Sequence, residues 1–234
     1  MDTDAIIPGG AAARRKQNRQ EMRSAILDVA RQIVDQEGVA KLTVRGIAQR
    51  LGYSAGAIYD YFPSKEHIVH ALYFLGTDGL GLHMQMALDA LPPDCPTLDA
   101  MFALAHTYRE FAHRHVDLYW LAFSGLRERP DNPQVLEAEE KGNAGFIPLI
   151  AIIQEGVANG TLVDTVDPLS MAVSAWTAVH GFVSLELSGH LSPQVLAGDG
   201  RDATFDLDPA TLHDRLFDDL VRTVLYGFVR RHPT

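Results

Sequence analysis

Residues 43–67 constrain this chain most, because they place two short helix patterns on either side of a glycine turn. The first pattern is apolar at the spacing of one helix face, and its members are Val44, Ile47, Ala48 and Leu51. Thr43 precedes it as a candidate N-cap. Gly52 follows it, and glycine takes the left-handed conformation after a helix without a steric penalty. We therefore expect a helix that begins after Thr43 and ends at Gly52.

A second short helix is predicted at roughly residues 55–61. Ser54 can accept a hydrogen bond from the free N–H groups at its start. Pro63 stops it, and Ser64 caps a further helix that begins at Lys65. Two helices joined by a tight glycine turn form a helix-turn-helix, whose second helix enters the major groove of DNA.

The side chains of this second helix suit such a position. Its first turn is small enough to approach a phosphate or a base edge, because it contains Ala55, Gly56 and Ala57. Tyr59 and Tyr61 add hydroxyl groups. Ile58 and Phe62 form the inward apolar pair that holds the helix down. An ordinary helical hairpin has the same spacing, so the pattern alone leaves both interpretations open.

From Arg19 to about Leu72 the sequence resembles the DNA-binding domain of the TetR family of bacterial transcriptional regulators. The matching features are an amphipathic first helix ending in Gly38, Leu42-Thr-Val-Arg-Gly-Ile-Ala48, Leu51-Gly-Tyr-Ser54 and Ala57-Ile-Tyr-Asp-Tyr-Phe-Pro-Ser-Lys-Glu66. Fixed residue types at fixed offsets over about fifty positions make a specific match. The resemblance favours DNA binding, with double-stranded operator DNA as the partner.

The resemblance also implies which residues touch DNA. Carried over position by position, contacts to bases or phosphates come from Thr43, Arg45, Ser54, Ala55, Gly56, Tyr59, Tyr61 and Lys65. Arg45 is the strongest candidate for a specificity contact, because arginine can bind guanine through two hydrogen bonds. Gly46 departs from the family pattern, since many relatives carry an acidic residue there. This departure removes a stabilising charge from the first turn of the helix.

The charge of the chain is unevenly distributed. The 234 residues carry a net charge of −10. Residues 14–65 hold ten Lys and Arg against five Asp and Glu, a net charge of +5. Residues 66–234 hold ten basic and twenty-three acidic residues, a net charge of −13. A positive head on an acidic body is expected of a protein that presents one end to phosphates.

The sequence divides into three segments. Residues 1–18 are predicted to be a flexible basic arm, 19–78 the DNA-binding domain, and 79–234 a helical domain for effector binding and dimerisation. The arm either reaches along the DNA backbone or into the minor groove, or is a mobile terminus. Glycines at positions 76, 79 and 81 predict an irregular or hinged second half of the helix that begins at Lys65.

The rest of the chain predicts an all-α fold, in which the helix-turn-helix domain precedes a helical body. After the proline-rich segment 91–96, helical patterns cover about residues 97–113, 116–127, 133–159, 168–189 and 209–231. Residues 188–208 are a long polar loop, a candidate lid or disordered insertion. The last two helices carry apolar faces wider than one internal contact needs. We expect them to form a homodimer interface, which would present two recognition helices to a palindromic operator.

An effector pocket is expected in the body. Trp176-Thr-Ala-Val-His-Gly181 resembles the Trp-x-x-x-His-Gly pattern of one subgroup of TetR-like C-terminal domains. The candidate pocket residues are Phe102, His106, Phe111, Tyr119, Trp120, Phe123, Trp176 and His180. Part of this set belongs to the core, and His180 fits a core histidine bonded to a polar neighbour slightly better than a pocket residue. A ligand of such a pocket would be largely apolar.

Other functional classes find no support in the sequence. His113 and His115 point away from each other on a helix, and no Cys/His spacing indicates a metal site. Cys95 is the single cysteine, so no disulfide forms within the chain. No nucleophile elbow or phosphate-binding glycine loop is present, so we expect neither an enzyme nor a cofactor. No apolar run is long enough to span a membrane, and no signal-peptide core precedes the head, which predicts a cytoplasmic protein.

The sequence therefore predicts a ligand-responsive, DNA-binding transcriptional regulator. By resemblance it is a repressor that a small effector releases from DNA. An activator, or a DNA binder that responds to no effector, would have the same head.

Overall fold

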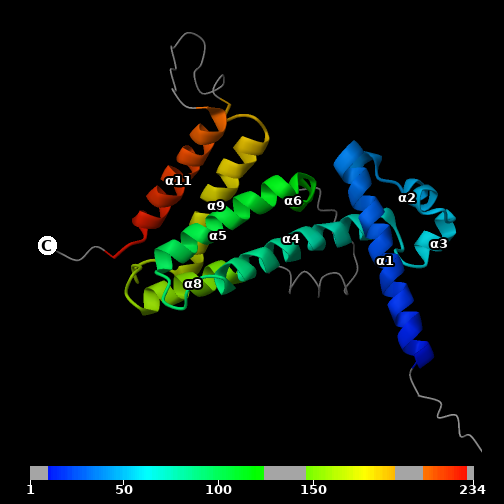
Figure 1. Cartoon of the computed structure of the whole chain (residues 1–234), viewed down its shortest axis with the longest axis horizontal. Coiled ribbons are helices and arrows are strands. Elements are labelled where there is room, and N and C mark those ends of the chain that lie inside the picture. Colours follow the sequence, from blue (N-terminus) through cyan, green and yellow to red (C-terminus); the bar gives the residue numbers. More distant parts are fainter. Residues whose placement is uncertain (1–9, 124–145, 193–207, 231–234) are drawn as a thin grey trace, which may run out of the picture. The chain divides into compact units, whose positions relative to one another are not determined.

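The computed structural model describes residues 10–123, 146–192 and 208–230, and these residues form helices joined by turns (Figure 1). The predicted all-α fold is confirmed. Contacts divide the chain into two compact units. The first, which we call the head, comprises the chain up to Leu75 and a segment that begins at Asp117. The second, the body, comprises Gly76–Val116 and the later helices.

The head is built from the short elements that the sequence predicts. They are α1 (Gly10–Glu37), the 3-10 turn η1 (Val39–Lys41), α2 (Val44–Leu51), α3 (Ala55–Tyr59) and the start of α4 (Lys65–Asp89). One apolar cluster joins them, with fully or almost fully buried side chains from α1, α2, α3 and α4; its largest members are Ile26, Leu42, Ile47, Ile58, Phe62, Ile68 and Leu72. The amphipathic first helix contributes further to this core, since its Ala30, Ile33 and Val34 are buried too.

Helix α1 begins earlier than predicted. It starts at Gly10, whereas the sequence predicts a flexible arm up to residue 18. Residues 10–18 of that arm are therefore helical, and residues 1–9 lie outside the described residues. The reason is local: alanine, arginine, lysine and glutamine are all strong helix formers, and extending an existing helix costs no new nucleation.

Helix α6 (Val116–Phe123) belongs mainly to the head, although it follows α5 in the chain. Leu121 is buried in the same apolar cluster as Ile26 and Ile58. Burial and the neighbouring carboxyl of Asp35, to which it is hydrogen-bonded, raise the pKa of Asp117. Contacts thus group α6 with the head, whereas the sequence-based limits place residues 79–234 together in one domain.

The body consists of the second half of α4 with α5 (Thr97–Arg114), α8 (Ile147–Ala158), α9 (Pro168–Leu187) and α11 (Pro209–Gly227). Helix α9 packs against α5, α8 and α11, and α5 also contacts α8 and α11 (Figure 1). Asp167 caps α9 and Asp208 caps α11 by accepting hydrogen bonds from free N–H groups in their first turns. The predicted extension to residue 133 and most of the loop 188–208 lie outside the described residues.

Helix α4 runs without interruption from Lys65 to Asp89, so the predicted irregularity at its glycines is wrong. Gly76 and Gly81 are buried, and a Cβ at Gly79 would meet the ring of Phe111 at 3.4 Å. These glycines therefore allow close packing of α4 in the body. The intact helix tolerates their low intrinsic propensity because tertiary contacts compensate for it.

The segment that follows α8 pairs with the segment that follows α11 through a short backbone contact. Leu162 forms an isolated antiparallel bridge with Val229, the Val163 N–H donates to the Phe228 carbonyl at 2.9 Å, and Leu162 is fully buried. A Cβ at Gly156 would come within 2.8 Å of Leu162, so only glycine fits there. Among the residues that the structure describes, no helix is long and apolar enough to cross a membrane.

Candidate nucleic-acid interface

The helix-turn-helix is held in shape by local hydrogen bonds. Thr43 Oγ1 accepts a hydrogen bond from the Gly46 N–H at 3.0 Å, which caps α2. Ser54 Oγ accepts one from the Ala57 N–H at 3.3 Å, which caps α3. Gly52 has φ 74°, the left-handed conformation that the glycine turn requires. Both predicted caps and the predicted turn are confirmed, and α3 ends at Tyr59, two residues before the predicted limit.

Burial fixes which side of α3 faces outward. Ile58 and Phe62 are each 1% exposed and anchor α3 in the head core. Tyr59, the next residue after Ile58, is 51% exposed, and Gly56 is exposed as well. The apolar pair therefore turns the opposite surface of α3 towards solvent. This is the geometry that a recognition helix needs.

The eight predicted DNA contacts all lie in the head, on α2, its cap, the turn, α3 and the first turn of α4. Five are exposed: Thr43, Arg45, Ser54, Gly56 and Tyr59. Three are half-buried: Ala55, Tyr61 and Lys65. The Arg45 side chain has no hydrogen bond or ion pair among the described residues, whereas Arg50 on the same helix binds Glu37 at 2.5 Å. Arg45 thus presents an uncommitted guanidinium beside the recognition helix.

Two arginines of α1, which sequence reasoning missed, hold the end of α3. The Arg19 guanidinium donates to the Asp60 carbonyl at 2.9 Å and lies over the ring of Tyr61. The Arg23 guanidinium donates to the Tyr61 carbonyl at 2.5 Å and lies 4.1 Å from the centre of the Phe62 ring. Burial, followed by the positive charge of Arg19, lowers the pKa of Arg23. Their four-residue spacing on one helix face was the available signal.

We call these two residues the arginine clamp. The clamp provides donors for two backbone carbonyls just past the end of α3, which would otherwise depend on water. It also fixes α3 to α1 by contacts that do not use the outward surface of α3. Tyr61, a predicted DNA contact, is therefore held in place by Arg19.

Two further features border the recognition helix. Tyr53, which belongs to the Leu51-Gly-Tyr-Ser54 motif and precedes the Ser54 cap, is 50% exposed. In the first turn of α4, Ser64 Oγ lies 3.0 Å from His67 Nδ1. A hydrogen bond from Ser64 is the main cause of the lowered pKa of Glu66, whose carboxylate sits at the positive end of the helix dipole. This negative charge partly offsets the charge of Lys65, a cation that the helix dipole disfavours at the start of a helix.

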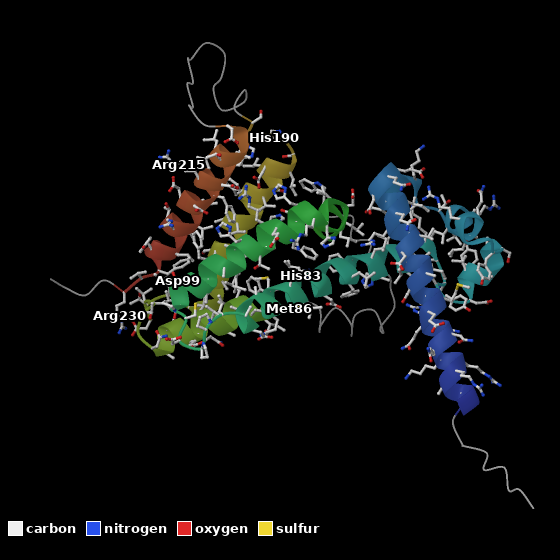
Figure 2. All side chains as sticks on the ribbon, viewed as in Figure 1. His83, Met86, Asp99, His190, Arg215 and Arg230 are labelled. Atoms are coloured by element: carbon white, nitrogen blue, oxygen red, sulfur yellow. The ribbon has the colours of Figure 1, made fainter. Side chains whose placement is uncertain are left out.

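The predicted pocket residues separate into groups. Tyr119 contacts the rings of both Trp120 and Phe123 in α6, in the head. The ring of His106 contacts that of Phe102 and meets the ring of Phe217 on α11 edge-on. Phe111 contacts the ring of His115 and that of His83 on α4, which Figure 2 labels. Trp176 and His180 form the remaining group.

His180 is bonded to a polar neighbour, as one of the two interpretations expected. Its Nδ1 lies 2.9 Å from the hydroxyl of Tyr108, a residue that is 4% exposed. The indole of Trp176 lies beside its ring, with ring centres 5.6 Å apart. Burial lowers the pKa of His180, so the imidazole is neutral at neutral pH. The pair places two polar atoms beside the indole of Trp176 in the body.

A buried carboxylate forms a second polar centre in the body. The Glu186 side chain is 4% exposed, and both its oxygens accept hydrogen bonds from Arg109, at 2.6 and 2.9 Å. His113 Nε2 lies 2.9 Å from Glu186, and Arg109 also donates to Asp214 at 2.7 Å. This network ties α5 to α9 and α11. No group of three or more potential ligands among the described residues could hold a metal ion.

The chain is similar to known regulators over most of its length. Residues 26–72 match the family described as bacterial regulatory proteins of the tetR family, and residues 101–212 match the tetracyclin repressor-like C-terminal domain. A helix-turn-helix transcriptional regulator of Mycobacterium tuberculosis is 26% identical over 209 residues, which are 89% of this chain and 82% of the relative. The transcriptional repressor KstR2 of Mycolicibacterium smegmatis is 28% identical over 59% of this chain and 66% of its own.

A solved structure supports the same relationship at the level of the fold. A protein of unknown function from a Rhodococcus species superposes with a TM-score of 0.68 at 23% identity, covering 89% of this chain and 95% of its own. The two family matches together span both the head and the body, and the head has the caps, turn and outward recognition helix that the family motif requires. The chain belongs to the TetR family of helix-turn-helix transcriptional regulators, which bind DNA through this head.

Proposed function

We propose that this regulator is a homodimeric repressor, which binds a palindromic operator and is released by a small, largely apolar effector. The recognition helix carries the proposal: Tyr59 and Gly56 face solvent while Ile58 and Phe62 lock the helix to the head core. The relative KstR2 is itself named a repressor, which supports the same sign of regulation for this chain. The alternative is an activator, or a DNA binder that responds to no effector.

The proposed contacts divide into base and phosphate readers. Arg45 has a free guanidinium and is assigned to a guanine edge. The Thr43 and Ser54 hydroxyls accept hydrogen bonds as caps, and each still has an O–H to donate to a phosphate. Gly56, together with Ala55, lets the backbone of α3 come close to the groove. Tyr59, Tyr61 and Lys65 complete the set with two hydroxyl groups and an ammonium.

Dimerisation is assigned to α9 and α11. Leu169, Val173 and Leu185 on α9 are 54%, 42% and 47% exposed, and Tyr226 on α11 is 60% exposed. A Cβ added at Gly181 would meet no atom within 4 Å, so the backbone of α9 is open to a close partner there. A second copy of the chain would cover this surface and supply a second recognition helix about 34 Å away, one turn of the duplex.

Release by an effector would work as a population shift. The Tyr108–His180 pair, beside Trp176, offers polar atoms that can orient a mostly apolar ligand in the body. Helix α4 passes from the head into the body at Leu75, and the chain returns to the head at Asp117. A ligand that prefers one body conformation would therefore act on the head through these two chain crossings, and would change the spacing of the two recognition helices.

A salt titration of binding to randomised duplex DNA tests the DNA part of the proposal. We expect enrichment of a palindrome and a steep fall in affinity with salt. Arg45→Ala should relax the sequence preference and cost about 1–3 kcal/mol at one base position. Arg50→Ala is the matched control, since Arg50 lies on the same helix as Arg45 but is paired with Glu37 of α1. A steep salt dependence without an enriched sequence would contradict operator reading.

The effector part is tested separately, by displacement of a fluorescent operator. A set of small apolar compounds is added to the protein–operator complex, and release is measured by anisotropy. We expect at least one compound to release wild-type protein but to act more weakly on Tyr108→Phe, which removes only the hydroxyl that meets His180. Failure of every compound, with operator binding intact, would favour the effector-independent alternative.

A further inference from the structure

The first turns of α1 form an exposed basic extension of the head. No residue from Gly10 to Glu21 that the structure describes is buried, and the first core residue of α1 is Ile26. Figure 1 shows these turns running beyond α2 and α3, and Figure 2 shows their side chains projecting with no other described element of the head beside them. A helical stretch without an apolar face gains no stability from packing against a core, so its exposed side chains are available to a partner.

The charge of this extension has one sign. It carries Arg14, Arg15, Lys16 and Arg19, while Glu21 is its single acidic residue and accepts a hydrogen bond from Gln17. Arg15 and Lys16 are exposed, and neither has a hydrogen bond or ion pair among the described residues. Arg14 differs, because its Nε donates to the Gly10 carbonyl at 3.0 Å. Two free cations therefore remain.

The arginine clamp shows which way these two cations face. Arg19 and Arg23 bind the carbonyls of Asp60 and Tyr61, the two residues that directly follow the recognition helix. Arg15 lies four residues before Arg19, and Lys16 lies three residues before it and seven before Arg23, so all four share one helix face. Arg15 therefore stands about 6 Å beyond the clamp along α1, which is the axial length of roughly two base pairs.

We propose that the helical extension of α1 is a second DNA-binding surface, on which Arg15 and Lys16 bind phosphates in the duplex just outside the half-site that α3 reads. The inference rests on the proposed operator binding and adds a flank-dependent contact that carries no base specificity. Its partner follows from charge complementarity, since two free cations continue the recognition face and phosphates are the anions that border a half-site. A continuous helix, rather than a loose tail, holds them in that register.

The test compares operators with and without flanking DNA. One duplex ends at the outer edge of the enriched palindrome, and a second adds four base pairs of arbitrary sequence at each end. Wild-type protein should bind the longer duplex about tenfold more tightly near physiological salt. Arg15→Gln with Lys16→Gln should abolish this gain and reduce the slope of log affinity against log salt by roughly 3 to 4 for a dimer, at about 0.9 for each phosphate. The preferred palindrome should stay the same.

Two further variants separate the possible causes. Arg14→Gln removes a charge from the same helix turn but from a different face, and should keep most of the gain. Gln17→Pro keeps every charge but breaks the extension, because proline removes a helix hydrogen bond and clashes with the preceding turn. It should lose the gain as the double variant does. Circular dichroism and thermal unfolding establish that the head stays folded in each variant.

The outcomes distinguish this inference from the function on which it rests. If the double variant keeps the flank gain and the salt slope while the palindrome is still enriched, the extension does not bind phosphates and the operator reading stands. If Gln17→Pro keeps the full gain, the basic segment acts as a flexible tail and the helical surface is overturned. If wild-type protein enriches no palindrome, the proposed function itself fails.

Discussion

At the scale of single residues, Arg23 connects the stability of the head to the position of the recognition helix. It lies over Phe62 and donates to the Tyr61 carbonyl, and its charge is tolerated although burial and Arg19 lower its pKa. Arg23→Ala would leave that carbonyl without its donor and uncover one face of Phe62. We expect the free energy of unfolding to fall by about 1–3 kcal/mol and operator affinity to fall as well.

Urea denaturation of the full-length protein measures this effect. Arg50→Ala is the control, because its ion pair with Glu37 is exposed at both partners and should contribute less than about 1 kcal/mol. Equal losses for the two variants would mean that Arg23 acts only as a surface charge.

Glu186 is the residue whose contribution should depend most clearly on pH. Burial acts to raise its pKa, but hydrogen bonds from Arg109 and His113 outweigh burial and leave the pKa below its ordinary value. A carboxyl with a lowered pKa stabilises the folded state above its unfolded pKa, and this stability is lost as the pH falls through the folded pKa. The contribution of Glu186 is therefore complete at pH 7 and disappears in acid, below about pH 4.

We expect Glu186→Gln to lower the free energy of unfolding at pH 7 by about 3 kcal/mol, because Arg109 would keep a charge without its buried partner. The difference from wild type should narrow as the pH falls below about 4. Glu110→Gln is the matched control, since Glu110 forms an exposed pair with Arg114. Denaturation curves at several pH values give the answer; a difference independent of pH would show that the carboxylate charge is not the cause.

At the scale of elements, two glycines of the helix-turn-helix are expected to have different roles, Gly52 in folding and Gly56 in contact with DNA. Gly52 has φ 74°, so Gly52→Ala places a side chain in the left-handed region and should cost about 1–2 kcal/mol of stability. Gly56 lies within α3, and a Cβ there would meet only Ser54 Oγ, at 3.8 Å. Gly56→Ala should therefore be neutral or stabilising for the fold.

Operator binding, in contrast to stability, should be sensitive to Gly56→Ala. If the backbone at Gly56 approaches the groove, the added methyl group of Gly56→Ala weakens operator binding although the protein is as stable as wild type. Thermal unfolding and operator titration on the same samples test this. Unchanged affinity for Gly56→Ala would remove Gly56 from the contact set.

The exposed surface of α9 allows a test of the proposed dimer interface. In one copy of the chain, a Cβ at Gly181 would meet no atom within 4 Å, and leucine is a better helix former than glycine by about 0.8–1 kcal/mol. Gly181→Leu should keep each subunit folded yet separate the dimer, because the leucine would occupy the space of the second copy. Light scattering after size exclusion measures the mass. Gln154→Leu, on the exposed side of α8, is the control, and a dimeric Gly181→Leu protein would place the interface elsewhere.

At the scale of the whole molecule, the parts that sequence reasoning found are those encoded locally. Thr43, Gly52 and Ser54 determine caps and a turn within a few residues of themselves, so their roles can be read directly from the sequence. The length of α1 is also determined locally, because its basic residues are good helix formers. The prediction of a flexible arm gave more weight to their charge than to this propensity.

The parts that sequence reasoning missed depend on distant residues. Arg109 and Glu186 are 77 positions apart, and nothing in either segment indicates that the two side chains meet. The arginine clamp joins α1 to residues about forty positions later. The aromatic residues proposed for a pocket were selected by type, and type does not determine which neighbours a ring packs against. They consequently appear in separate groups.

The burial of Leu121 in the head core has a consequence for how such regulators can recombine. Residues 26–72, which match the family's DNA-binding region, do not contain the whole core, because α6 contributes a side chain from beyond the body helix α5. A gene fusion that exchanged this region alone would leave Leu121 against a foreign surface. Recombination that preserves the fold must therefore exchange α6 together with the head, or select compatible pairs, so the inherited unit is discontinuous in the gene.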